Sequence, residues 1–184
     1  MPRKISLLFC LSALALLLTA GPAQATKTSR MLAPGSVCKN QTNLSAPLAA
    51  QEQAILCMTN FARRKAGMGR FGGHEKLNHS AVRKGEDILR CNSFSHYACD
   101  RDFTYWLEAL DYTDGCWAAG ENLAWGTGDY GTVRSVFRAW MNSPGHKSNI
   151  LSNNFSQIGI GLRVGSLEGH PDARVWVQHF GDRC

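Results

Sequence analysis

The spacing of apolar residues changes along this chain, and that change limits the folds that the chain can adopt. In the longer N-terminal part, apolar side chains recur every three or four positions, as on one face of an amphipathic helix. The pattern predicts helices at residues 48–65, 76–90, 103–110 and 131–141. The segment Ser143-Pro144-Gly145 is expected to end the last of them.

The C-terminal part instead shows the two-residue alternation of strands. Residues 157–164 and 174–180 alternate, with a turn rich in Gly, Pro and Asp between them, and so predict a hairpin. Gly159 and Gly161 fall on one face and leave room for a helix to pack closely. With a further strand expected near residues 119–125, the pattern indicates an α+β fold, helices on a small antiparallel sheet.

The N-terminus has the pattern of a secretory signal peptide. Two basic residues precede an uncharged apolar run, and Ala23-Gln24-Ala25 fits a signal peptidase site. We therefore expect residues 1–25 to be removed, residues 26–46 to form an extended arm, and residues 47–184 to form one folded domain. No later apolar run is long enough to cross a bilayer, so the mature protein is expected to be secreted, extracellular or periplasmic.

Six cysteines remain after removal of the signal peptide, and an even number in an exported chain indicates disulfides rather than metal ligands. They are Cys38, Cys57, Cys91, Cys99, Cys116 and Cys184. The sequence alone does not choose among the possible pairings. Our working expectation joins Cys38 to Cys57, Cys99 to Cys116, and Cys91 to Cys184.

The charge balance is moderately basic. The full chain carries +6, and loss of Arg3 and Lys4 with the signal peptide leaves +4. We interpret the cluster Arg63-Arg64-Lys65 as the cationic end of a helix, because the other basic residues are scattered. No nucleic-acid partner is therefore expected, whereas a weak preference for anionic surfaces such as wall polymers follows from the charge.

Three short segments each place an ionisable side chain beside a turn. They are Phe94-Ser95-His96, Gly120-Glu121-Asn122 and Ser143-Pro144-Gly145-His146. Polar residues next to Gly or Pro lie where the backbone turns, so His96, Glu121 and His146 are expected to line a cleft, with Ser143 beside them. Two imidazoles and a carboxylate form a set that binds a divalent metal such as zinc or performs acid–base chemistry.

Several motifs, in this order and spacing, resemble those of the CAP superfamily: the cysteine-rich secretory, antigen 5 and pathogenesis-related 1 proteins, also called SCP-domain proteins. The resemblance runs from about Gln51 to Gly181. Within the family, the chain is similar to the secreted bacterial branch. Its carriers are Asn60-Phe61-Ala62-Arg63, Phe94-Ser95-His96, the run from Ala119 to Gly126, the run from Trp140 to Leu151, Ile158-Gly159-Ile160-Gly161, and the run from Trp176 to Gly181. The resemblance implies a three-layer α-β-α sandwich with a small central antiparallel sheet.

The resemblance also implies a cleft with two histidines and two acids, from which this chain departs. His96 and Glu121 match the first histidine and the first acid. Ser143 stands where many eukaryotic members have the second acid, and Asn154-Phe155-Ser156-Gln157 replaces the motif that carries the second histidine. By similarity to the bacterial branch, His146 is expected to supply the second imidazole, and Glu121 to orient one or both rings.

Binding, rather than turnover, is the function that the resemblance favours. The protein is expected to be a monomer. Its expected ligand is a lipid or sterol, an anionic wall polymer or an extracellular protein. Two enzymatic alternatives stay open: a metal-dependent, protease-like hydrolase with His96, His146 and Glu121 as ligands, and a ribonuclease-like acid–base pair. The first lacks a His-Glu-x-x-His helix and the second a convergent Arg cluster. His79 and His179 are expected to be packing or surface residues.

Overall fold

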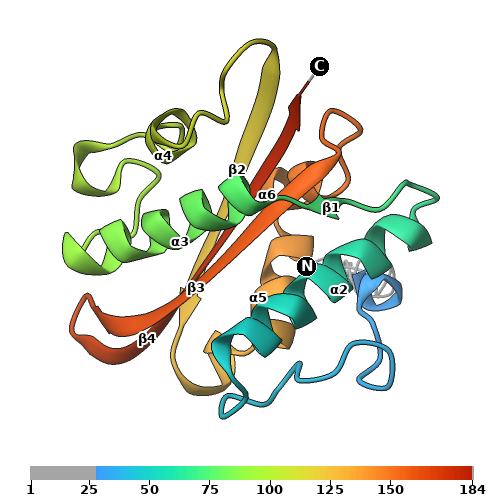
Figure 1. Cartoon of the computed structure of the whole chain (residues 1–184). Helices are drawn as coiled ribbons and strands as arrows, with labels where there is room; N and C mark the ends of the chain where they lie inside the picture. The colour runs from blue at the N-terminus through green and yellow to red at the C-terminus, as the bar shows by residue number, and fades with distance from the viewer. Residues whose placement is uncertain (1–27, 184) are drawn as a thin grey trace, which may run out of the picture.

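The computed structural model describes residues 28–183 (Figure 1). The expected signal peptide and residue Cys184 lie outside this range. Within it, no helix combines the length and the apolar character that a membrane span needs. Residues 28–31 form one helical turn, and residues 32–46 consist of turns and irregular backbone, so the described part of the arm is not the extended segment that we expected.

The helices agree with the periodicity of the sequence, with one addition. The structure contains α2 (Leu48–Lys65), α3 (Glu75–Arg90), α4 (Tyr105–Ala109), α5 (Val133–Asn142) and α6 (Pro144–Ile150), with 3-10 turns at Ala98–Asp100 and Gly128–Gly131. The segment expected only to end a helix also begins α6. Proline is favoured at the first position of a helix because its missing N–H would have no partner there.

Four strands form one sheet in the order β1-β3-β4-β2. They are β1 (Gly72–Gly73), β2 (Trp117–Gly126), β3 (Gln157–Leu167) and β4 (His170–Arg183). The three long strands pair antiparallel, as expected, while the two-residue β1 pairs parallel with β3. The hairpin turn is tighter than the sequence indicated: Glu168 and Gly169 alone connect the strands, both with positive φ, as a type I′ turn requires.

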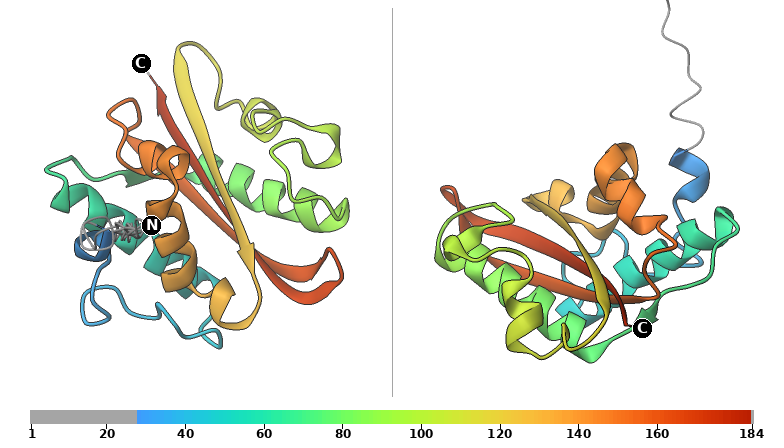
Figure 2. Two further views of the ribbon diagram at one scale, coloured as in Figure 1. Left: turned by 180° about the vertical axis from the view of Figure 1, so that it is seen from behind. Right: turned by 90° about the horizontal axis from the view of Figure 1, so that it is seen from above.

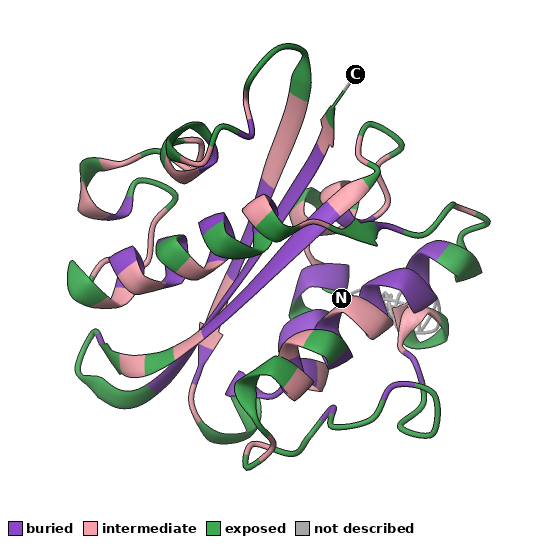
Figure 3. Ribbon diagram, in the orientation of Figure 1, coloured by how far each residue is buried: buried purple, intermediate pink, exposed green. Residues whose placement is uncertain are grey.

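The sheet is the middle layer of three, as the α+β prediction and the family resemblance implied. The helices α3 and α4 cover one face, and α2, α5 and α6 cover the other (Figures 1 and 2). The larger core lies between the sheet and α2 and α5, where Phe137, Trp140, Trp176 and Phe180 are almost completely buried. The central strands are therefore buried on both faces (Figure 3).

The two glycines of β3 bring α3 close to the sheet, as predicted. A Cβ atom on Gly159 would lie 2.0 Å from the backbone carbon of Leu77, and one on Gly161 would lie 2.5 Å from that of Ala81. No side chain fits at either position. The close approach holds α3 against β3 and β4, and so fixes the position of Ser80 and Lys84 on its inner face.

The disulfides agree only partly with expectation. Cys38 is bonded to Cys57, which ties the N-terminal arm to α2 as predicted. Cys91, however, is bonded to Cys99, so the expected pairs Cys99–Cys116 and Cys91–Cys184 are wrong. The chain reverses after α3 through left-handed backbone at Asn92 and Cys99, which brings the Cα atoms of Cys91 and Cys99 to 5.5 Å.

Candidate functional site

The site is built around Glu121 in the middle of β2. The antiparallel register pairs Glu121 with His179 of β4, so both side chains point to the α3 face of the sheet. The Glu121 side chain is only 2% exposed, and His179 is completely buried. A carboxylate at this depth is stable as an anion only when several donors satisfy it.

Both carboxylate oxygens of Glu121 are bonded to histidines. Oε1 accepts a hydrogen bond from Nδ1 of His96 at 2.5 Å, and Oε2 accepts one from Nε2 of His179 at 2.8 Å. The other nitrogen of His179 lies 2.6 Å from the hydroxyl of Ser80 on α3. Burial opposes ionisation of Glu121, but the hydrogen bonds from His179 and His96 outweigh it and lower the pKa of the carboxyl.

His96 is the exposed end of this network. Its side chain is 52% exposed, and Nε2 makes no hydrogen bond to any described residue. The hydrogen bond to Glu121 raises the pKa of His96, against the opposing effect of partial burial. The ring is thus held at Nδ1 by a fixed carboxylate and offers Nε2 to solvent or to a ligand.

A buried lysine supports the loop that carries His96. Lys84 of α3 is 1% exposed, and its ammonium donates to the backbone oxygen of His96 at 2.5 Å. Burial lowers the pKa of Lys84, while nearby Glu121 and Asp87 oppose that shift. The disulfide of Cys99 closes the same loop three residues later. The position of His96 is therefore fixed from its ring and from its backbone.

His146 is carried by α6, which packs against β2 on the face of the sheet opposite α3. Its backbone oxygen accepts a hydrogen bond from Asn122 of β2 at 3.1 Å. Burial and the nearby charge of His96 lower the pKa of His146. Nδ1 of His146 is buried and has no hydrogen-bond partner among the described residues. Ser143 caps α6 one turn earlier and makes no side-chain capping bond.

Sequence reasoning missed His179 as a member of the network. The alternation along β4 correctly places the side chains of His179 and Trp176 on opposite faces of the sheet. Only the pairing of β2 with β4 brings His179 to Glu121. Glu121 thus orients His96 and His179, whereas no hydrogen bond joins it to His146. Ser80, His179 and Glu121 have the residue types of a catalytic triad, yet burial of Ser80 excludes it as an accessible nucleophile.

The donor set does not fit a three-ligand metal centre. Among residues 28–183, no group of three His, Cys, Asp or Glu side chains is arranged to hold a metal ion. Both oxygens of Glu121 are already engaged, which leaves only His96 and His146 as candidate ligands. A catalytic zinc site uses three protein ligands, and these two histidines supply at most two of them.

Comparisons with known proteins agree with this architecture. The model of the cysteine-rich secretory protein family (CAP) matches residues 48–180. The YkwD protein of Bacillus subtilis is 34% identical over 176 residues, covering 88% of this chain and 62% of YkwD. The membrane protein YlbC of the same bacterium is 27% identical over 135 residues, covering 70% of this chain and 34% of YlbC. The chain therefore spans less than two thirds of the length of either relative.

Solved structures share the fold at lower identity. An extracellular SCP-domain protein of Bacillus anthracis superposes with a TM-score of 0.60 at 23% identity, over 73% of this chain and 41% of that one. An outer surface protein of Borrelia burgdorferi gives a TM-score of 0.62 at 18% identity, over 76% of this chain and 97% of that one. Because the family model covers the sheet and the helices from α2 onward, the chain belongs to the CAP, or cysteine-rich secretory protein, family.

Proposed function

We propose that this protein acts outside the cell as a binding module whose ligand enters the cleft formed by His96, Glu121, Ser143 and His146. The observation that carries the proposal is the difference in burial among the side chains of the hydrogen-bond network. Glu121, His179 and Ser80 are buried and fully bonded, whereas His96 exposes about half of its side chain. A rigid polar group at the end of a buried network is a preorganised contact for a ligand.

The charges in the cleft favour a ligand that accepts hydrogen bonds. The hydrogen bond with Glu121 raises the pKa of His96, and in the protonated ring Nε2–H would donate to an anionic or hydroxyl oxygen. Lipid headgroups, sterols, anionic wall polymers and protein carboxylates all present such oxygens. The extracellular and outer-surface origin of the structural neighbours supports secretion of this chain as well.

One observation favours a second candidate, an acid–base hydrolase that uses His96 on a water molecule. An imidazole with Nδ1 on a carboxylate and Nε2 exposed has the arrangement of a general base. The metal-dependent form of this alternative would need a third ligand beside His96 and His146. Zinc titration by calorimetry separates the two forms, since one-to-one micromolar binding that disappears in His96→Ala would support the metal-dependent one.

The binding function is tested with a defined panel: phosphatidylglycerol vesicles, cholesterol, palmitate and poly(glycerol phosphate). If the wild type binds a panel member, His96→Ala should weaken that binding by about tenfold, because the substitution removes one charge-assisted hydrogen bond. His79→Ala is the matched control, since His79 is exposed on the outer face of α3. Equal binding by both variants, or no binding of any panel member by the wild type, would contradict the proposal.

A further inference from the structure

Charged residues are segregated between the two outer layers of the fold. The helices α2, α5 and α6 carry six Lys or Arg residues and one acid, Glu52. The segment from α3 to residue 114 carries five Lys or Arg residues and eight acids. The sheet separates the two sets (Figure 2), so the mature protein's modest positive charge is concentrated on one face.

The two sides of the sheet also differ in whether their charged side chains form ion pairs. On the α3 side, Arg83 pairs with Glu86, and Arg90 and Arg101 pair with Asp87. On the opposite face, three cations near the C-terminal end of α2 and on α6 form no ion pair and no side-chain hydrogen bond with any described residue; they are Arg64, Lys65 and Lys147. Arg30 and Arg70 lie beside them and are unpaired within residues 28–183 in the same way.

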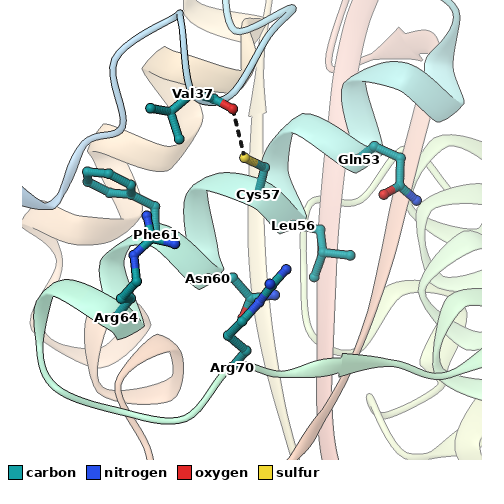
Figure 4. Close-up of a pocket in the computed structure, with 8 residues that line it drawn as sticks. All are labelled: Val37, Gln53, Leu56, Cys57, Asn60, Phe61, Arg64 and Arg70. Atoms are coloured by element: carbon teal, nitrogen blue, oxygen red, sulfur yellow. Dashed lines mark hydrogen bonds between the residues drawn. The ribbon is translucent and has the colours of Figure 1, made fainter.

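These unpaired cations line two neighbouring hollows that share the side chain of Phe61. The smaller hollow, about 170 Å³, holds Arg64 and Arg70 beside Asn60 (Figure 4). The larger, about 730 Å³, is lined by three cations and by apolar side chains. Its lining consists of Ser29, Arg30, Met31, Leu32, Pro34, Phe61, Lys65 and Lys147. No acidic residue lines either hollow.

We propose that this face is a docking site for a flexible phosphodiester polymer, distinct from the His96 cleft. One phosphate would lie between Arg64 and Arg70, whose guanidinium groups match phosphate oxygens bidentately. A neighbouring phosphate would lie against Arg30, Lys65 and Lys147. The carbon linker between phosphates would contact Met31, Leu32 and Pro34. The alternation of cationic and apolar lining thus matches the alternation of phosphate and linker along such a polymer.

The exposed side chains favour a polymer over a membrane surface. A surface that docks on lipid presents apolar side chains that enter the bilayer. Among the described residues, Val37 is the only large apolar side chain that both lines a hollow and is strongly exposed, at 50%. Phe61 is only 8% exposed. The cations therefore surround recessed sites for individual anionic groups.

The test measures binding of poly(glycerol phosphate) at two salt concentrations. The double variant Arg64→Ala, Arg70→Ala should bind at least about tenfold more weakly, with a shallower salt dependence, because two phosphate contacts are lost. The control Lys76→Ala, Arg83→Ala removes the same charge from α3 and should bind within about twofold of wild type. Thermal unfolding of both double variants, whose replaced residues lie on the surface, checks that the fold stays intact.

Three outcomes would overturn this docking site. Equal weakening by both double variants would show that only net charge matters. Weakening by His96→Ala but not by Arg64→Ala, Arg70→Ala would place the polymer in the cleft, which would leave the proposed function standing alone. Binding to phosphatidylglycerol vesicles without binding to the polymer would identify the face as membrane-directed instead.

Discussion

Replacing Glu121 with glutamine removes the negative charge shared by His96 and His179 while keeping the size of the side chain. In the native protein the carboxylate accepts one hydrogen bond from each ring. A charge-assisted hydrogen bond stabilises a protein by roughly 1 kcal/mol more than a neutral one. Losing two of them costs about 2 kcal/mol, partly offset because an amide is easier to bury than a carboxylate. We expect Glu121→Gln to lower the free energy of unfolding by about 1–2 kcal/mol.

The loss should depend on pH in a direction fixed by the two pKa shifts. The pKa of Glu121 is lowered from 4.5, so its stabilising effect is present above pH 4.5 and is lost as the pH falls through the lowered value. The pKa of His96 is raised from 6.5, so its effect is present below pH 6.5 and is lost as the pH rises through the raised value. The difference between wild type and variant should therefore be largest between pH 4.5 and 6.5.

Urea unfolding at several pH values, with NMR titration of the histidine rings, measures both effects. The pKa of His96 should fall in Glu121→Gln, because the largest cause of its shift is removed. Glu168→Gln is the control: Glu168 is exposed at the hairpin turn, and its replacement should change stability by less than about 0.5 kcal/mol. A stability difference that is the same at pH 5.5 and pH 9, or an unchanged pKa of His96, would refute the reasoning.

Three further variants test how the scaffold holds the site. Gly161→Ala should destabilise the protein by at least about 2 kcal/mol in thermal unfolding, because its Cβ would lie 2.5 Å from the α3 backbone; Gly35→Ala, with open space around it, should not. Replacing Cys91 and Cys99 by alanine should cost about 2.5 kcal/mol in oxidised protein, as expected for a loop of eight residues. Lys84→Met should change global stability little but speed amide exchange at His96 about tenfold, since the ammonium no longer holds the loop; unchanged exchange would contradict that role.

Local patterns predicted the elements well because each is encoded over a short stretch. The apolar spacing gave α2 and α3 within a residue, and the glycines at 159 and 161 correctly indicated a closely packed helix. The α6 helix was missed because the prediction used Pro144 only as the end of one helix, although proline also favours the first position of the next.

The part of the site that depends on the pairing of distant strands could not be predicted from the sequence. Glu121 and His96 were identified from their motifs, but the second histidine of Glu121 is 58 residues away in sequence, on β4. Only the strand register brings His179 to that carboxylate, and no pattern within either strand encodes the register. The prediction of the Cys91 disulfide was wrong for a related reason. Cys91 meets Cys99 because the chain reverses after α3, and this reversal depends on left-handed backbone at Asn92 and Cys99.

The most direct test of the proposed cleft is a chemical-shift map of the labelled protein titrated with the panel compound that binds. The account predicts that the largest changes fall on His96, Ser143 and His146, with smaller changes at the buried Ser80 and His179. Changes confined to other surfaces, with the ring signals of His96 unmoved at saturation, would contradict the assignment of this cleft as the binding site.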